Sequence, residues 1–122
     1  MDDEYKVTLE ELEKYIEEEE VLAEEEYLSK YHKDYSDGTH QRELRRLKTV
    51  RKLLLAGANE MYWGDGCVYI QEGDTTFRFY LLNQMWSAIK NPYKQKVSWR
   101  GRKMYYCKSP EDFVKKYVLR NN

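Results

Sequence analysis

Apolar side chains recur at helical spacing over the first third of the chain. Thr8-Leu9-Glu10-Glu11 has the form of a capping box, in which the Thr8 hydroxyl accepts a hydrogen bond from the backbone N–H of Glu11. The apolar positions of the predicted helix share one face: Leu9, Leu12, Ile16, Ala23 and Tyr27. The pattern predicts one long helix that runs to about Tyr35, where Ser36-Asp37-Gly38 interrupts it.

A second helix is predicted directly after this break. Thr39 is placed to cap it, and Gly57 can adopt the left-handed conformation at which many helices end. The apolar positions that we expect to point inward are Leu44, Leu47, Val50 and Leu54. Because the turn between the two helices is short, they are expected to pack antiparallel.

Beyond Gly57 the pattern changes to the alternation that is typical of strands. Segments 62–63, 67–71 and 75–82 are separated by glycine-containing turns and predict an antiparallel meander. A short helix is expected over 84–90, ending before Asn91-Pro92, since the residue before a proline is disfavoured in helices. Segments 96–100 and 103–107 are expected to form a second hairpin about Gly101.

The last segment is predicted to be a helix that packs on the sheet. Ser109 is expected to cap it, with Pro110 at the first helical position. The side chains expected to face the sheet are Phe113, Val114, Tyr117 and Val118. The predicted fold is α+β, with an N-terminal antiparallel helical hairpin packed on a small antiparallel sheet and a C-terminal helix. We expect one domain over 1–122, with the hairpin at 1–57 and the remaining elements at 58–122.

Charge is distributed unevenly along the chain. The 122 residues carry a net charge of −1, but residues 1–37 contain 15 acids and 4 bases and the other 85 residues have a net charge of +10. Such asymmetry is typical of an acidic arm or of a basic surface that binds polyanions.

Cysteine usage and hydropathy indicate the compartment. Cys67 and Cys107 lie 40 residues apart and neither belongs to a Cys-x-x-Cys pair, so we interpret both as reduced strand residues. No run approaches the roughly 20 apolar residues of a membrane span, and Met1-Asp2-Asp3-Glu4 lacks the basic start of a signal peptide. We therefore expect a cytoplasmic protein with no membrane partner.

Five glutamates form a stripe beside the apolar face of the first helix. They follow the i, i+3, i+4 spacing and are Glu10, Glu13, Glu17, Glu20 and Glu24. Like charges at this spacing destabilise an isolated helix, and the second helix carries six bases against one acid, Glu43. Three interpretations stay open: the helices neutralise each other along their seam, the stripe imitates a phosphate backbone in a partner's nucleic-acid channel, or it docks on a basic protein.

Segment 90–108 is basic and aromatic and contains no acid. Cations that neutralise phosphates and rings that stack on bases are the combination that binds single-stranded nucleic acid or a nucleotide. The candidate binding residues are Lys94, Lys96, Trp99, Arg100, Arg102, Lys103 and Tyr105. The alternatives are a protein contact and a hairpin whose apolar side chains face the core while its charges protect an edge strand.

Signals of catalysis are weak. His32 and His40 flank the predicted interhelical turn near Asp34 and Asp37, a grouping that suits a small acid/base or metal site but equally suits solvent-exposed loop histidines. The chain contains no glycine-rich phosphate loop, no nucleophile elbow and no His-Glu-x-x-His motif. We therefore predict no catalytic residues, no metal and no cofactor.

The sequence favours a non-catalytic binding protein. In size and composition the chain resembles small phage-encoded accessory proteins, including inhibitors of bacterial defence systems, although no motif carries this likeness. The order of hairpin then helix over 97–122 also resembles the layout of some small DNA-binding domains. The expected partner is a protein or nucleoprotein complex, such as a nucleic-acid-handling or host-defence complex, and a homodimer is compatible with the sequence. The alternatives are direct binding of nucleic acid or a nucleotide through 90–108, and a small enzyme that uses His32 and His40.

Overall fold

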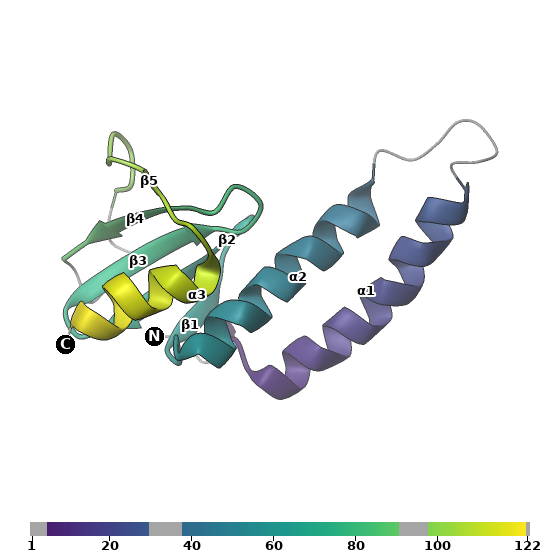
Figure 1. The fold of residues 1–122 in the computed structure, drawn as a ribbon, viewed down its shortest axis with the longest axis horizontal. Coiled ribbons are helices and arrows are strands. Elements are labelled where there is room, and N and C mark those ends of the chain that lie inside the picture. The colour runs from purple at the N-terminus through teal and green to yellow at the C-terminus, as the bar shows by residue number, and fades with distance from the viewer. Residues whose placement is uncertain (1–4, 30–37, 91–97, 122) are drawn as a thin grey trace.

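The structure, a computed structural model, describes residues 5–29, 38–90 and 98–121. Helices α1 (Leu9–Ser29) and α2 (Thr39–Ala56) precede the strands β1 (Met61–Trp63), β2 (Cys67–Glu72), β3 (Thr75–Tyr80), β4 (Met85–Ile89) and β5 (Tyr105–Tyr106). The last helical segment consists of α3 (Pro110–Phe113), the π-helical turn η4 (Val114–Val118) and the 3-10 turn η5 (Leu119–Asn121). The predicted α+β architecture is confirmed, and Figure 1 shows α2 between α1 and the sheet.

Helix α1 begins where the sequence predicts. The backbone N–H of Glu11 donates to the Thr8 hydroxyl at 3.4 Å, and the flanking Val7 and Leu12 are both buried. Helix α1 is described to Ser29, and the predicted continuation beyond it to about Tyr35 lies outside the described residues. Gly57 ends α2 as predicted, because its φ of 122° turns the chain while its N–H reaches back to carbonyls of the last turn.

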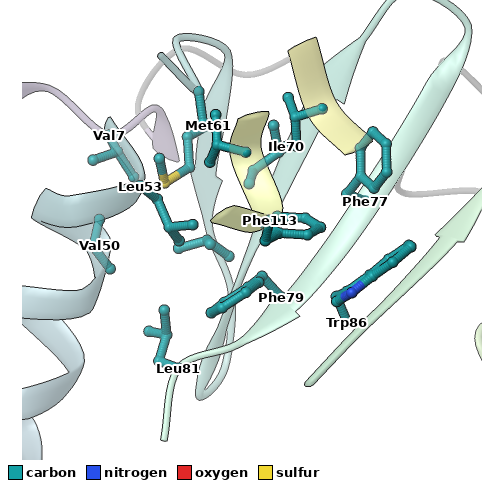
Figure 2. Close-up of a cluster of buried hydrophobic side chains, with 14 of the residues drawn as sticks. Val7, Val50, Leu53, Met61, Ile70, Phe77, Phe79, Leu81, Trp86 and Phe113 are labelled. Atoms are coloured by element: carbon teal, nitrogen blue, oxygen red, sulfur yellow. The ribbon is translucent and has the colours of Figure 1, made fainter. Parts of the chain in front are cut away.

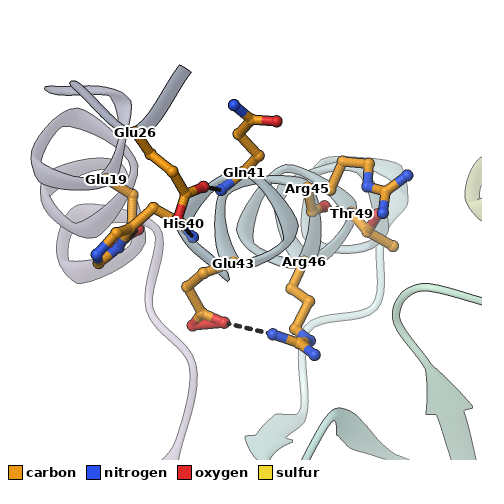
Figure 3. A network of polar contacts seen from close by, with 8 residues as sticks. All are labelled: Glu19, Glu26, His40, Gln41, Glu43, Arg45, Arg46 and Thr49. Atoms are coloured by element: carbon orange, nitrogen blue, oxygen red, sulfur yellow. Dashed lines mark hydrogen bonds and ion pairs between the residues drawn. The ribbon is translucent and has the colours of Figure 1, made fainter. Parts of the chain in front are cut away.

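The start of α2 differs from the prediction that Thr39 caps it. The N-cap residue is Gly38, with φ 82°, and it supplies no side-chain cap. Glu26 of α1 caps the helix from across the hairpin, since its carboxylate accepts from the backbone N–H groups of His40 and Gln41, each at 3.0 Å (Figure 3). A carboxylate is favourable there because the N-terminus of a helix carries partial positive charge and unpaired N–H groups.

The sheet is an antiparallel meander in the order β1-β2-β3-β4-β5. The predicted strands at 62–63, 67–71 and 75–82 correspond to β1, β2 and β3. The predicted helix over 84–90 is wrong: this segment contains β4, which pairs with β3 over 76–80. Gln84, at φ 53°, lies in the turn that reverses the chain, and the strand then buries Trp86. The packing of Trp86 in the core therefore decides the conformation of this segment, and Pro92 is compatible with an extended chain before it.

The second hairpin also differs from the sequence prediction. Residues 98–100 form no strand, and β5 pairs with β4 instead. Both cysteines are free: Cys67 is buried in β2, as expected, whereas Cys107 follows β5 and is partly buried. The Cys107 thiol donates to the carbonyl of Gln84 at 3.2 Å.

One face of the sheet packs against the helices to form the core (Figure 2). Phe113 of α3 is fully buried, and its ring centroid lies 4.9 Å from that of Phe79, 5.2 Å from that of Trp86 and 5.7 Å from that of Phe77. Ser109 caps α3 as predicted, because its hydroxyl accepts from the backbone N–H of Asp112 at 3.1 Å. The cap thereby fixes the turn that delivers the Phe113 ring to the sheet.

The predicted inward face of the last helix is confirmed for three of its four residues. Phe113, Val114 and Val118 are fully buried. Tyr117 is 44% exposed, although its ring still lies 4.6 Å from that of Trp86. Tyr117 therefore covers the edge of the core rather than filling it.

The opposite face of the sheet carries a cluster of rings about one cation. The Arg78 guanidinium lies 4.8 Å from the ring centroid of Tyr80, 5.7 Å from that of Tyr69 and 5.9 Å from that of Trp99. Segment 98–104 lies across this face, since Trp99 also contacts Tyr69 and the Ser87 hydroxyl donates to the Lys103 carbonyl at 2.9 Å. The contact of Trp99 with Arg78 and the hydrogen bond from Ser87 therefore hold this segment on the sheet.

Candidate functional site

The acidic stripe of α1 divides into paired and unpaired carboxylates. Glu13 forms an ion pair with Arg51 at 3.2 Å, and Glu20 lies 3.9 Å from Lys48, so part of the stripe neutralises the basic helix α2 as one interpretation expects. Glu10, Glu17 and Glu24 are exposed and form no ion pair within the described part of the chain. These three carboxylates remain available to a partner.

The unpaired carboxylates share one side of α1 with two apolar residues. Glu10, Glu17, Val21, Glu24 and Leu28 are spaced by 7, 4, 3 and 4 residues, which places them in one row along a helix. Val21 is 57% exposed and Leu28 is 54% exposed. We call these five residues the outer face of α1.

The net charge of α1 is the second property of this surface. The helix contains ten glutamates and one lysine, a net charge of −9.

We expect a peptide of residues 5–36 to be mostly unstructured at pH 7, because isolated helices are only marginally stable and repulsion between carboxylates destabilises them further. Helicity, measured by circular dichroism, should rise as the pH approaches 4 and the glutamates become protonated.

A matched peptide provides the control for this prediction. Replacement of Glu10, Glu17 and Glu24 by glutamine should raise the helicity at pH 7 and reduce its pH dependence, because each replacement removes one repelling charge. High helicity of the unmodified peptide at pH 7 and low salt would contradict the argument.

The predicted histidine cluster is only partly described. His32, Asp34 and Asp37 lie outside the described residues. His40 lies in α2, where its Nδ1 is 3.0 Å from a carboxylate oxygen of Glu19 (Figure 3). Among the described residues, no three His, Cys, Asp or Glu side chains are grouped to hold a metal ion. His40 thus joins the two helices at the site where Glu26 caps α2.

The structure separates the residues of the predicted nucleic-acid site. Lys94 and Lys96 lie outside the described residues, and Arg100, Arg102 and Lys103 are exposed. Trp99 packs on the Arg78 face of the sheet, whereas Tyr105 pairs with Trp86 in register and stacks on it at 4.8 Å on the opposite, helix-bearing face. The Lys103 ammonium lies 5.4 Å from the Tyr105 ring centroid. The two rings therefore do not form one stacking platform.

A pocket of about 430 Å³ lies where α1 and α2 meet β1, and the sequence analysis did not anticipate it. Its lining consists of Glu11, Tyr15, Glu18, Glu19, Glu43, Leu47 and Trp63. We call it the acidic–aromatic pocket. The spacing of Glu11, Tyr15 and Glu18, at i, i+4 and i+7, does place them on one side of a helix. That spacing gives no sign that Trp63, more than forty residues away, completes the pocket.

Comparison with known protein families, curated proteins and solved structures found no match to this chain. None of the helices in the described part of the chain is long and apolar enough to cross a membrane. The surfaces of the molecule that could bind a partner are the outer face of α1, the acidic–aromatic pocket and the exposed bases of 98–108.

Proposed function

We propose that this protein is a non-catalytic docking protein that binds a basic protein partner through the outer face of α1. The observation that carries the proposal is that this face presents three unpaired carboxylates together with two apolar side chains that are more than half exposed, Val21 and Leu28. Apolar side chains beside charged ones are the usual composition of a binding surface.

The position of α1 supports the proposal. Helix α2 lies between α1 and the sheet, so α1 is the outermost element on its side of the molecule (Figure 1). The seam side of α1 is occupied, because Leu12, Ile16 and Ala23 are buried and Glu26 caps α2. The outer face therefore has no structural task within the described part of the chain.

The charge of α1 indicates the chemistry of the partner. A helix of net charge −9 attracts surfaces rich in lysine and arginine, and electrostatic steering raises the rate of encounter. Proteins that handle nucleic acids present such surfaces because they bind phosphates. The proposed partner is therefore a component of a nucleic-acid-handling or host-defence complex, whose basic surface α1 would occupy in the manner of small phage-encoded inhibitors.

Affinity purification with matched variants tests the proposal. Tagged wild-type protein should retain a basic protein from a nuclease-treated native lysate. The triple variant Glu10→Gln, Glu17→Gln, Glu24→Gln should bind this protein about tenfold more weakly, mainly because association slows when steering charges are removed. Recovery is quantified by mass spectrometry, and association rates are then measured with the purified partner at two salt concentrations.

The control variant is Arg100→Gln, Arg102→Gln, Lys103→Gln, which removes an equal number of exposed charges from the other surface. It should leave partner recovery unchanged. Recovery that depends on this variant and not on the α1 variant would overturn the proposal.

Direct nucleic-acid binding is tested with the same proteins. Fluorescence anisotropy with labelled single-stranded and duplex oligonucleotides compares about 50 and 200 mM salt, a range over which six to ten phosphate contacts change affinity by about 10³ to 10⁵. The docking proposal expects no binding at the lower salt. Binding that is lost in the Arg100, Arg102 and Lys103 variant would favour the alternative function.

A further inference from the structure

The acidic–aromatic pocket combines two aromatic rings with four carboxylates. The ring centroids of Tyr15 and Trp63 lie 6.4 Å apart at 57°, so the two rings form an angled pair beside the opening. Tyr15 is 39% exposed, which leaves part of its ring accessible. The volume of about 430 Å³ falls within the range of about 300 to 1,000 Å³ that is typical of sites for small ligands.

The carboxylates of the pocket are not equivalent. Glu43 forms an ion pair with Arg46 at 3.2 Å, and Glu19 lies 3.0 Å from the His40 ring. Glu11 and Glu18 form no ion pair within the described residues. Two carboxylates therefore remain for a ligand, and both lie on the same side of α1 as Tyr15.

The surroundings of the Tyr15 hydroxyl disfavour its ionised form. Desolvation is the largest cause, followed by the Glu11 carboxylate, which also accepts a hydrogen bond from this hydroxyl, and by the Glu18 carboxylate; all raise the pKa of Tyr15 above its ordinary value. Tyr15 is neutral at physiological pH, as an ordinary tyrosine is. It presents an aromatic face beside two anions, an arrangement that attracts a cation.

We infer that the acidic–aromatic pocket binds an arginine side chain of the protein partner, an inference that rests on the proposed docking function. A guanidinium group is planar, so it stacks on an aromatic ring, and its five N–H donors can engage Glu11 and Glu18 together. Its aliphatic stem fits against Leu47. A quaternary ammonium would satisfy the rings but would donate no hydrogen bond to the carboxylates.

The pocket is tested with a defined probe that does not require the natural partner. N-acetyl-arginine methylamide is titrated into the full chain labelled with ¹⁵N, and the indole N–H signal of Trp63 is followed by NMR. This signal is assigned by its disappearance in Trp63→Phe. We expect a saturable shift with the arginine probe. The neutral isostere N-acetyl-citrulline methylamide should bind at least about fivefold more weakly, because it cannot form charge-assisted hydrogen bonds.

Two variants that each remove one negative charge distinguish binding in the pocket from general attraction to the charge of α1. Glu18→Gln should weaken arginine binding about fivefold, whereas Glu24→Gln, which changes the same charge on the outer face, should weaken it less than about twofold. N-acetyl-trimethyl-lysine methylamide, a quaternary ammonium probe, is titrated in the same way. Equal effects of the two variants, equal affinities for the arginine and citrulline probes, or tighter binding of the trimethyl-lysine probe would each overturn the inference.

The arginine titration and the partner-recovery experiment have distinguishable outcomes. If the arginine probe fails while the outer-face variant still loses its partner, the pocket inference falls and the docking proposal stands. If the probe binds in the pocket as expected but partner recovery does not depend on α1, the docking proposal falls, and with it the assignment of the arginine to that partner, while the pocket stands as a site that binds arginine.

Discussion

Replacement of Phe113 by alanine is expected to lower the free energy of unfolding by about 3 to 5 kcal/mol, the cost of removing a fully buried aromatic side chain. The Phe113 ring contacts the rings of Phe77, Phe79 and Trp86, so its loss leaves a cavity between α3 and three strand residues at once. Because small domains are stable by only about 5 to 15 kcal/mol, the variant should be close to its unfolding threshold at 37 °C.

Chemical denaturation followed by circular dichroism measures this effect. The matched control is Leu55→Ala, since Leu55 is 66% exposed and belongs to a regular helix. It should change the free energy of unfolding by no more than about 0.5 kcal/mol. If Phe113→Ala lowered the free energy of unfolding as little as the control does, Phe113 of α3 would not be an important part of the core.

Replacement of Glu26 by alanine is expected to lower the free energy of unfolding by about 2 kcal/mol. The Glu26 side chain is only 8% exposed, and it accepts from two backbone N–H groups at the start of α2 that have no local cap. Glu26→Gln keeps one acceptor oxygen, so it should lower the free energy of unfolding by about half as much as Glu26→Ala.

Hydrogen exchange gives a residue-specific readout of the Glu26 cap. The amides of His40 and Gln41 should exchange faster in Glu26→Ala, although they lie in the other helix. Glu25→Ala, a change at an exposed neighbouring position, should leave both amides and the free energy of unfolding nearly unchanged. Unchanged exchange of His40 and Gln41 in Glu26→Ala would contradict the assigned cap.

The elements predicted correctly from the sequence are those whose signals are local. The capping residues Thr8 and Ser109, the end of α2 at Gly57 and the alternation of β2 and β3 each depend on a few consecutive residues. The helix predicted over 84–90 is wrong because Trp86 is placed by rings from β3, α3 and β5, which no local pattern contains. The cap of α2 was missed for the same reason, since Glu26 precedes His40 by fourteen residues.

The candidate sites also combine features that the sequence shows with contacts that only the structure shows. The acidic stripe is visible in the sequence, but only the structure shows that Glu13 and Glu20 are paired while Glu10, Glu17 and Glu24 are not. The basic aromatic segment is equally visible, yet sequence order does not show that Trp99 and Tyr105 lie on opposite faces of the sheet. Which side chains converge on a surface depends on strand register, and a one-residue change in register exchanges the two faces.

The meander topology has a consequence for synthesis on the ribosome. Each strand from β2 to β5 pairs with the strand that precedes it in sequence, so successive hairpins can form as the chain lengthens. The Phe113 ring, which packs against Phe77, Phe79 and Trp86, is nevertheless made only after all five strands. A nascent chain that ends at Cys107 therefore exposes three large apolar side chains on a preformed sheet, the kind of surface that chaperones bind and that aggregates when they are absent.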